Sequence, residues 1–201
     1  MLVHANSAKI PGHRRDRVIS FMSFRNFFVA DGPGSATERP VFFAVSILKL
    51  VLLSLCSLGL YQLYWFYKNW QYVKERERLS IRLAWRVAVP YFYCYQLFRR
   101  LVDYDHPALE PSSLAAGPLA CGWILTLFAG FLPSPYWLAN YLGFVFLIPL
   151  QLRANQINAA VAPGHYRNTH FTAGNWIWLV LGGGLLLPVV IGSVALSYGE
   201  R

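Results

Sequence analysis

The chain has 201 residues, of which 56% are hydrophobic and only 13% are charged. Soluble domains average roughly 25% charged and 45–50% apolar residues, so this composition excludes an ordinary water-soluble surface. Between Glu110 and Glu200 the only formal charges are those of Arg153 and Arg167. The net charge is +9, and the basic residues flank the apolar runs. The sequence contains no nucleic-acid-binding module. The composition therefore predicts an integral membrane protein and no nucleic-acid partner.

Residues 1–40 predict a flexible basic tail, followed by a single membrane-embedded helical domain at 41–201. The tail ends in DGPGSATERP, whose glycines and prolines disfavour regular structure. We expect no cleavable signal peptide, because charged residues interrupt the apolar stretch near the N-terminus. The cysteines lie in apolar surroundings without a metal-binding spacing, which favours buried thiols over disulfides. They are Cys56, Cys94 and Cys121.

The first long apolar run, at about 46–67, predicts a transmembrane helix with Ser46 as its N-cap. At 1.5 Å per residue this helix would be about 33 Å long, which is enough to cross the hydrocarbon core. Its one cation, Lys49, lies in the first turn, from which a long side chain can reach the interface.

Aromatic residues mark the place where this run gives way to charge, in the sequence YQLYWFYKNW. Tyrosine and tryptophan concentrate at the headgroup level because each joins an apolar body to a polar tip. On a helix these rings point in several directions, so we favour an interfacial belt over a ring-lined binding groove. The belt consists of Tyr61, Tyr64, Trp65, Tyr67 and Trp70.

From Lys74 onward, cations recur every four residues behind the rings, and on a continuing helix they would form a basic face. Near a membrane such a face attracts anionic phospholipids, at about 1 kcal/mol per cation. An ordinary solvated helix face is the alternative interpretation. The residues of this basic face are Lys68, Lys74, Arg78, Arg82 and Arg86.

The next apolar stretch, at about 83–98, is short and is interrupted by Arg86 and Pro90. It therefore predicts an interfacial amphipathic segment instead of a span. The loop DYDHPALE follows and contains four oxygen or nitrogen ligands between Asp103 and Glu110. Their spacing matches no known metal-binding loop, which favours a solvated connector over a metal site.

Three further spans are predicted at about 115–133, 136–152 and 174–197. Together with the first, they give an all-α polytopic bundle of about four transmembrane helices. The second span of the four carries a small-xxx-small pattern, which lets helices approach closely. That pattern consists of Gly122, Thr126 and Gly130.

A polar but uncharged stripe crosses the third span, in and before the sequence LQLRANQINAA. Carboxamides in hydrocarbon need hydrogen-bond partners, so this stripe is expected to face protein or water and not lipid. We favour interhelical hydrogen bonds that hold the bundle together; the alternative is a polar path for a neutral solute. The stripe consists of Asn140, Gln151, Asn155 and Asn158.

Basic residues predict the orientation, because cytoplasmic loops carry the excess of lysine and arginine. Residues 68–100 hold eight of them, so the loop 68–114 is predicted to be cytoplasmic. Four full spans then place the tail outside, although residues 1–40 carry six cations. A first segment that enters only half-way, hinged near Gly59, would keep the tail inside.

The stretch 59–70 fits the pattern Gly-[IL]-Tyr-x-x-Tyr-Trp-Phe-Tyr-x-Asn-Trp. It resembles the signature of a family of small, uncharacterised bacterial membrane proteins. The sequences QLRANQIN and NTHFTAGNW are similar to later parts of the same family, and the resemblance covers about 41–182. It implies a protein of the bacterial inner membrane, which the predicted spans make multi-pass, and it implies no activity and no catalytic residue.

Three functional classes remain, and the sequence favours them unequally. A non-enzymatic membrane protein that assembles with partners or binds lipid needs only the predicted spans, basic face and carboxamides. A small transporter or channel subunit usually carries ionisable residues inside its spans, and only Lys49 comes near that position. An intramembrane enzyme needs a nucleophile with a base, or an open metal site, and the predicted spans offer neither. We predict the first class, with no cofactor or metal. Its partners would be the bilayer, anionic phospholipids and either a second copy of the chain or another membrane protein.

Overall fold

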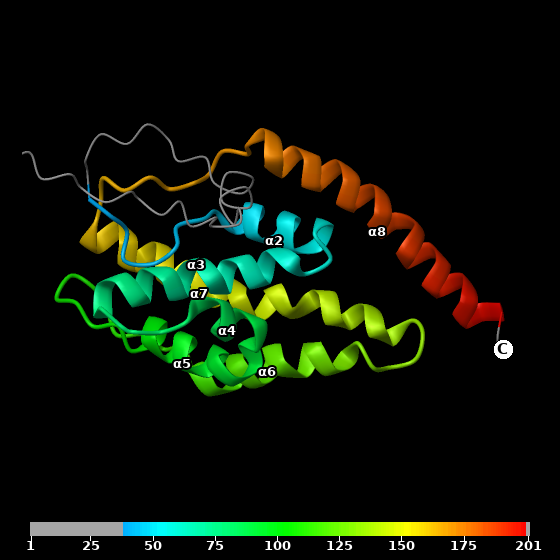
Figure 1. The fold of residues 1–201 in the computed structure, drawn as a ribbon, viewed down its shortest axis with the longest axis horizontal. Coiled ribbons are helices and arrows are strands. Elements are labelled where there is room, and N and C mark those ends of the chain that lie inside the picture. The colour runs from blue at the N-terminus through cyan, green and yellow to red at the C-terminus, as the bar shows by residue number, and fades with distance from the viewer. Residues whose placement is uncertain (1–37, 200–201) are drawn as a thin grey trace, which may run out of the picture.

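The structure is a computed structural model that describes residues 38–199. All regular elements in this part of the chain are helices (Figure 1), so the prediction of an all-α protein is confirmed. Nearly all of the predicted tail, 1–40, lies outside the described residues. The elements are α2 (Ile47–Cys56), α3 (Leu60–Glu77), α4 (Leu83–Ala88), α5 (Pro90–Val102), α6 (Ala116–Ala129), the 3-10 helix η1 (Tyr136–Gly143), α7 (Phe144–Val161) and α8 (Ala173–Gly199).

Helices α2 and α3 form a hairpin and not one spanning helix. α2 ends at Cys56, and Gly59 then adopts a left-handed conformation with φ of 88°, which glycine tolerates because it has no Cβ. α3 runs back beside α2 (Figure 1), so the Phe43 N–H donates to the Asn69 side chain at 3.1 Å. The continuous helix predicted over 46–67 is therefore wrong, and the chain reverses at the residue that the hinged alternative required.

Helix α3 stops before the predicted basic face is complete. Arg78 follows its last residue in a left-handed conformation with φ of 50°, and α4 begins only after Arg82. The five predicted cations thus lie on separate elements, so the continuous stripe does not form. The predicted interfacial segment 83–98 comprises α4 and most of α5, which are divided at Val89, and Pro90 occupies the first turn of α5, where its missing N–H breaks no helical bond.

The second hairpin consists of α6 and the η1–α7 segment. Its turn lies on the same side of the molecule as the α2–α3 turn (Figure 1). The predicted span 136–152 begins as a 3-10 helix and becomes α-helical only at Phe144; it then continues through Pro149 to Val161. Aromatic rings fill the core between these helices. Phe66 of α3 lies 5.8 Å from Phe98 of α5 and 4.7 Å from Trp123 of α6, measured between ring centroids.

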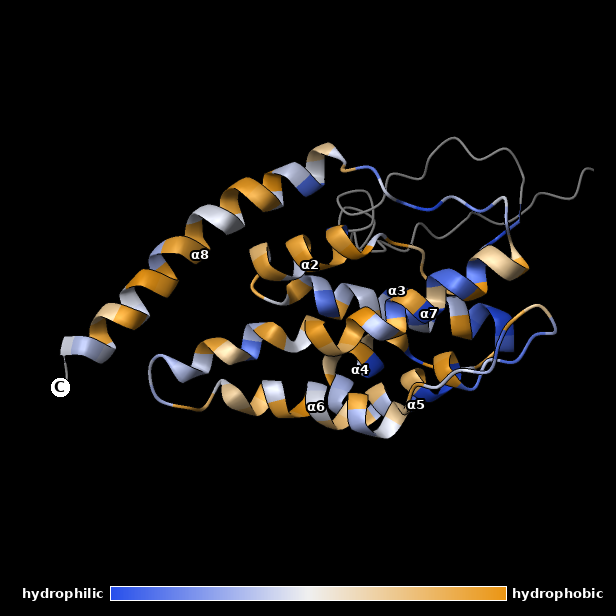
Figure 2. Ribbon diagram, turned by 180° about the vertical axis from the view of Figure 1, so that it is seen from behind, coloured by the Kyte–Doolittle hydropathy of each residue, from blue (hydrophilic) through white to orange (hydrophobic). Residues whose placement is uncertain are grey.

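Helix α8 extends away from the other helices and carries the C-terminus toward the end of the molecule where the α2–α3 and α6–η1 turns lie (Figure 1). It crosses α2 at Gly182, where an added Cβ would overlap the carbonyl oxygen of Cys56. Hydrophobic residues occupy most of its length (Figure 2). Within the described chain it is the one helix long and apolar enough to cross a membrane, with a mean hydropathy of 2.3 in its most apolar window.

Candidate functional sites

Three carboxamides of α7 hold the extended chain that leads into α2. Asn158 is fully buried, and its Oδ1 accepts hydrogen bonds from the backbone N–H groups of Val41 at 2.8 Å and Phe42 at 3.0 Å. Its Nδ2 donates to the Phe42 carbonyl oxygen at 2.8 Å. One side chain thus satisfies three backbone groups that have no helical partners, which buried backbone requires.

Gln151 and Asn155 continue this arrangement along α7. Gln151 Nε2 donates to the Phe43 carbonyl at 3.0 Å and to Asn155 Oδ1 at 2.9 Å. Gln151 Oε1 accepts from the indole of Trp65 at 2.5 Å. Asn155 Nδ2 donates to the Val45 carbonyl at 3.0 Å. The polar groups of this cluster are therefore engaged by the protein itself.

One predicted member of the stripe, Asn140, lies outside this cluster. It belongs to η1 and packs beside Gly130 at the end of α6. The prediction that Asn140 shares a helix face with Gln151 assumed one continuous α-helix. The 3-10 helix η1 before α7 changes the number of residues per turn, so the two side chains do not share a face. A fourth carboxamide, Asn69 of α3, binds the extended segment instead, because its Oδ1 accepts a hydrogen bond from the Phe43 N–H at 3.1 Å.

Lys49 is buried and does not reach an interface. Its exposed fraction is 0%, and its ammonium group donates to Asn168 Oδ1 at 2.8 Å and to the His170 carbonyl at 2.9 Å. With the Asn175 amide turned so that its oxygen faces the lysine, that oxygen accepts a third bond at 3.0 Å. The lysine thereby ties α2 to the loop that precedes α8.

The predicted aromatic belt is in large part the protein core. Tyr61, Trp65 and Trp70 each have an exposed fraction of 0%, whereas Tyr64 and Tyr67 are half-buried. The prediction of an interfacial belt is therefore wrong for the three buried residues. They are buried because α5, α6 and α7 return over α3, which the local sequence of α3 does not reveal.

The small-residue pattern of α6 lies where α6 meets the η1–α7 segment. An added Cβ at Gly122 would overlap the ring of Phe146, and one at Gly130 would lie 3.6 Å from the Asn140 side chain. Thr126 Oγ1 donates to the Trp123 carbonyl at 2.7 Å. These residues thus lie where the two helical segments meet.

The predicted basic residues take different positions around α3 and α4. Lys68 and Lys74 are half-buried on α3, and Arg78 and Arg82 are exposed at the ends of helices. Arg86 of α4 folds back over the indole ring of Trp70, 4.1 Å from its centroid, and over the ring of Tyr93 at 4.9 Å. Burial, together with the nearby cation of Arg100, lowers the pKa of Arg86 below its ordinary value.

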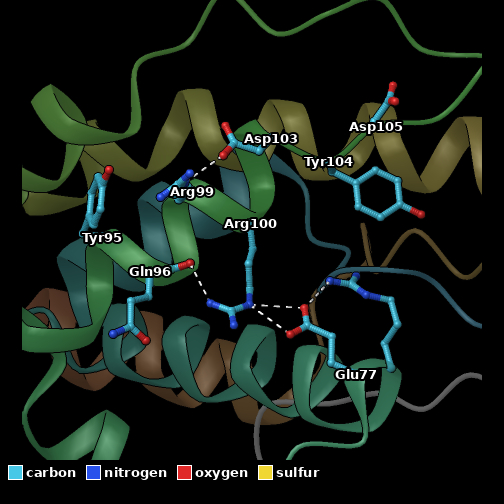
Figure 3. Close-up of a pocket in the computed structure, with 9 residues that line it drawn as sticks. Glu77, Tyr95, Gln96, Arg99, Arg100, Asp103, Tyr104 and Asp105 are labelled. Atoms are coloured by element: carbon cyan, nitrogen blue, oxygen red, sulfur yellow. Dashed lines mark hydrogen bonds and ion pairs between the residues drawn. The ribbon is translucent and has the colours of Figure 1, made fainter.

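A charged cleft of about 620 Å³ lies between the C-terminal ends of α3 and α5 (Figure 3). On one wall, Glu77 accepts from Arg100 Nε at 3.1 Å and from Arg76 Nη2 at 3.3 Å. On the other, Arg99 Nε pairs with Asp103 at 3.0 Å, and this hydrogen bond raises the pKa of Arg99.

Arg153 positions the loop that contributes Tyr104 and Asp105 to the lining of this cleft. The residue is almost fully buried on α7, and its guanidinium group donates to the carbonyl oxygens of Glu110 at 3.0 Å and Tyr104 at 3.3 Å. In the sequence, Arg153 stands out only as one of the two formal charges between Glu110 and Glu200. Its actual role is to hold Tyr104 and its neighbours beside α5.

The cleft is the part of the molecule that sequence reasoning missed. The four-residue spacing of Arg99 and Asp103 is a local signal of an ion pair on one helix face. Glu77 and Arg100 are 23 residues apart, so their pairing depends on the fold. No group of three or more His, Cys, Asp or Glu residues that could hold a metal ion occurs within residues 38–199.

Comparisons with protein-family models, with curated proteins and with solved structures gave no match. The resemblance carried by residues 59–70 therefore stays a prediction.

Proposed function

We propose that this is a multi-pass membrane protein with a non-enzymatic role in lipid binding and membrane-protein assembly. One observation carries this proposal: α8 is long and apolar, and only 11% of the residues in its most apolar 18-residue stretch are buried within the protein. Val180, Ile191 and Leu196 are exposed at 68%, 66% and 65%. Large apolar surfaces of this kind on a long helix fit contact with lipid or with other membrane helices.

The same proposal includes a topology of three crossings and one re-entrant hairpin. The α6 helix, the η1–α7 segment and α8 would cross, whereas α2–α3 would enter and return to its starting side. The reversal of the chain at Gly59 supports this arrangement. So does the hydropathy of the bundle, because most polar residues lie at the end away from the turn at Gly59 (Figure 2). The chain before Val41 and the segments 78–115 and 162–172 would then be cytoplasmic, which agrees with the excess of cations in them.

The extended chain before α2 fits within such a topology. Non-helical backbone is tolerated at membrane depth only where protein or water satisfies its polar groups. The carboxamides of Gln151, Asn155 and Asn158 supply those partners. Because these amides are engaged by the backbone, they favour a structural role over the polar path that a transporter of neutral solutes needs.

Membrane extraction of α8 variants tests the proposal. The wild-type protein is expected to stay with membranes after an alkaline carbonate wash and to dissolve only in detergent. Leu185→Arg, near the middle of α8, is expected to weaken insertion by about 2.5–3.5 kcal/mol. Tyr198→Arg, at the end of the same helix, is the matched control and should insert normally. A wild-type protein that is monodisperse in water without detergent would contradict the proposal.

The assembly role has its own test, which is identification of what copurifies with the protein in mild detergent. We expect a defined membrane protein, a second copy of the chain or bound phospholipid. Solute uptake by vesicles that contain the purified protein, lost on the Asn155→Ala substitution in an otherwise folded protein, would favour the transporter instead.

A further inference from the structure

We propose that the cleft between α3 and α5 binds the headgroup of an aminophospholipid. The phosphate would bind to the arginines and the primary ammonium group to the carboxylates. This inference rests on the proposed membrane function and extends it, because it names the chemistry of the lipid and the residues that recognise it.

The charges of the cleft select a ligand that carries both signs. Three guanidinium and three carboxylate groups line it, so their formal charges cancel. A purely anionic headgroup would meet these carboxylates as well as the arginines, and like-charge contacts oppose binding. A zwitterion with a phosphate and an ammonium group can satisfy both walls. The six residues are Arg76, Arg99, Arg100, Glu77, Asp103 and Asp105.

Hydrogen-bond donors for a phosphate remain in the cleft after the protein's own bonds are made. Arg99 donates from Nε to Asp103, and Arg100 donates from Nε to Glu77 and from Nη1 to the Gln96 carbonyl. Within the described residues, no protein acceptor is bonded to either Nη group of Arg99 or to Nη2 of Arg100. Planar guanidinium groups with such free N–H donors suit phosphate oxygens.

An acceptor for the ammonium group lies on the same rim. Asp105 is exposed, lines the cleft and has no ion pair within residues 38–199. Asp103 uses Oδ2 for Arg99, so its second oxygen is available. Figure 3 shows these two carboxylates on the side of the cleft away from Glu77.

Aromatic rings hold two of the arginines in place before any ligand binds. The guanidinium carbon of Arg76 lies 4.7 Å from the ring centroid of Phe42 and 5.4 Å from that of Tyr104. That of Arg100 lies 5.4 Å from the centroid of Trp70. Such stacking lowers the conformational entropy that the arginines lose on binding a ligand.

The surface of α5 identifies the ligand as a lipid and not a soluble phosphate compound. Tyr91, Tyr95 and Arg99 are four residues apart and share one helix face. Tyr91 and Phe92 are exposed at 44% and 69%, and Tyr95, exposed at 47%, lines the cleft. This face changes from aromatic to charged over about 12 Å at 1.5 Å per residue. Acyl chains can lie against the rings while the headgroup enters the cleft, as amphipathic rings at a membrane interface allow.

Native mass spectrometry of the full-length protein in detergent tests this inference. The probes are phosphatidylethanolamine, phosphatidylglycerol and phosphatidylcholine with identical acyl chains, together with free phosphoethanolamine. Phosphatidylethanolamine is expected to bind about tenfold more tightly than the other two lipids, as one charge-assisted hydrogen bond implies. The glycerol headgroup lacks the ammonium group, and the choline headgroup has no N–H to donate. Free phosphoethanolamine should bind more weakly than the lipid.

Two exposed positions supply variants that are not expected to disturb folding. Arg99→Gln should weaken phosphatidylethanolamine binding about tenfold, and Asp105→Asn should remove the preference for it over the other two lipids. Arg82→Gln changes an exposed cation outside the cleft and should have no effect.

Equal binding of phosphatidylglycerol and phosphatidylethanolamine would overturn the inference, and so would equal effects of Arg99→Gln and Arg82→Gln. Binding of free phosphoethanolamine as tight as that of the lipid would also overturn it, by assigning the cleft to a soluble ligand. These outcomes leave the proposed membrane function intact, whereas failure of carbonate-resistant insertion would contradict that function separately.

Discussion

Replacement of Asn158 by alanine would remove the largest single anchor of the extended segment before α2. The side chain makes three hydrogen bonds to the backbone of Val41 and Phe42 in a buried site. A net hydrogen bond contributes about 1 kcal/mol, and a buried group left without a partner costs about 1–3 kcal/mol. With three groups affected, Asn158→Ala is expected to lower the free energy of unfolding by about 3 kcal/mol or more.

Chemical unfolding in mild detergent, followed by tryptophan fluorescence, measures this change. Asn140→Ala is the matched control, because Asn140 is a half-buried asparagine outside the cluster. Within residues 38–199 no hydrogen bond to the Asn140 side chain would be broken, so Asn140→Ala should lower the free energy of unfolding by less than about 1 kcal/mol. Equal losses for the two variants would refute the assignment of Asn158 as the anchor of the segment.

Two further predictions concern the α2–α8 crossing and the buried thiol of α5. Gly182→Ala places a Cβ against the carbonyl oxygen of Cys56 and should destabilise the protein by about 1–3 kcal/mol through overpacking. Gly184→Ala is the control, because a Cβ added there meets nothing within 4 Å, and it should leave the stability unchanged. Equal decreases in the thermal unfolding temperature of the two variants would contradict the observed crossing. Burial raises the pKa of Cys94 to about 11, so the fraction of reactive thiolate should rise about tenfold per pH unit between pH 8 and 10. The rate of maleimide labelling, measured with Cys56 and Cys121 replaced by serine, checks this, and a rate that levels off below pH 9 would contradict it.

The all-α fold class and the positions of the apolar segments could be predicted from the sequence. Both follow from the hydropathy of the chain and from the helical spacing of its residues. The need of the carboxamides for partners was also predictable, since Gln151 and Asn158 lie within an apolar region. It could not be predicted that their partner is the extended backbone before α2. The segment 41–45 reads VFFAV, and hydropathy does not distinguish an extended apolar segment from the start of a helix.

The aromatic residues and the cleft were harder to predict for a different physical reason. The position of Trp65 and Trp70 at a polarity boundary is visible in the sequence, whereas their burial depends on helices that return from later in the chain. The predicted basic face assumed that α3 continues, and the left-handed residue Arg78 ends it. The cleft joins Glu77 to Arg100, a pairing that local periodicity does not encode.

The re-entrant hairpin is tested most directly by mapping the side of the membrane to which three positions are exposed. Single cysteines at Glu38, Ala108 and Gly199, in a chain without native cysteines, would be labelled with an impermeant maleimide in sealed vesicles of known orientation. The proposed topology predicts that positions 38 and 108 react from the same side and that position 199 reacts from the other. Reaction of position 38 from the side opposite position 108 would show that α2 and α3 cross the membrane, and would contradict the account.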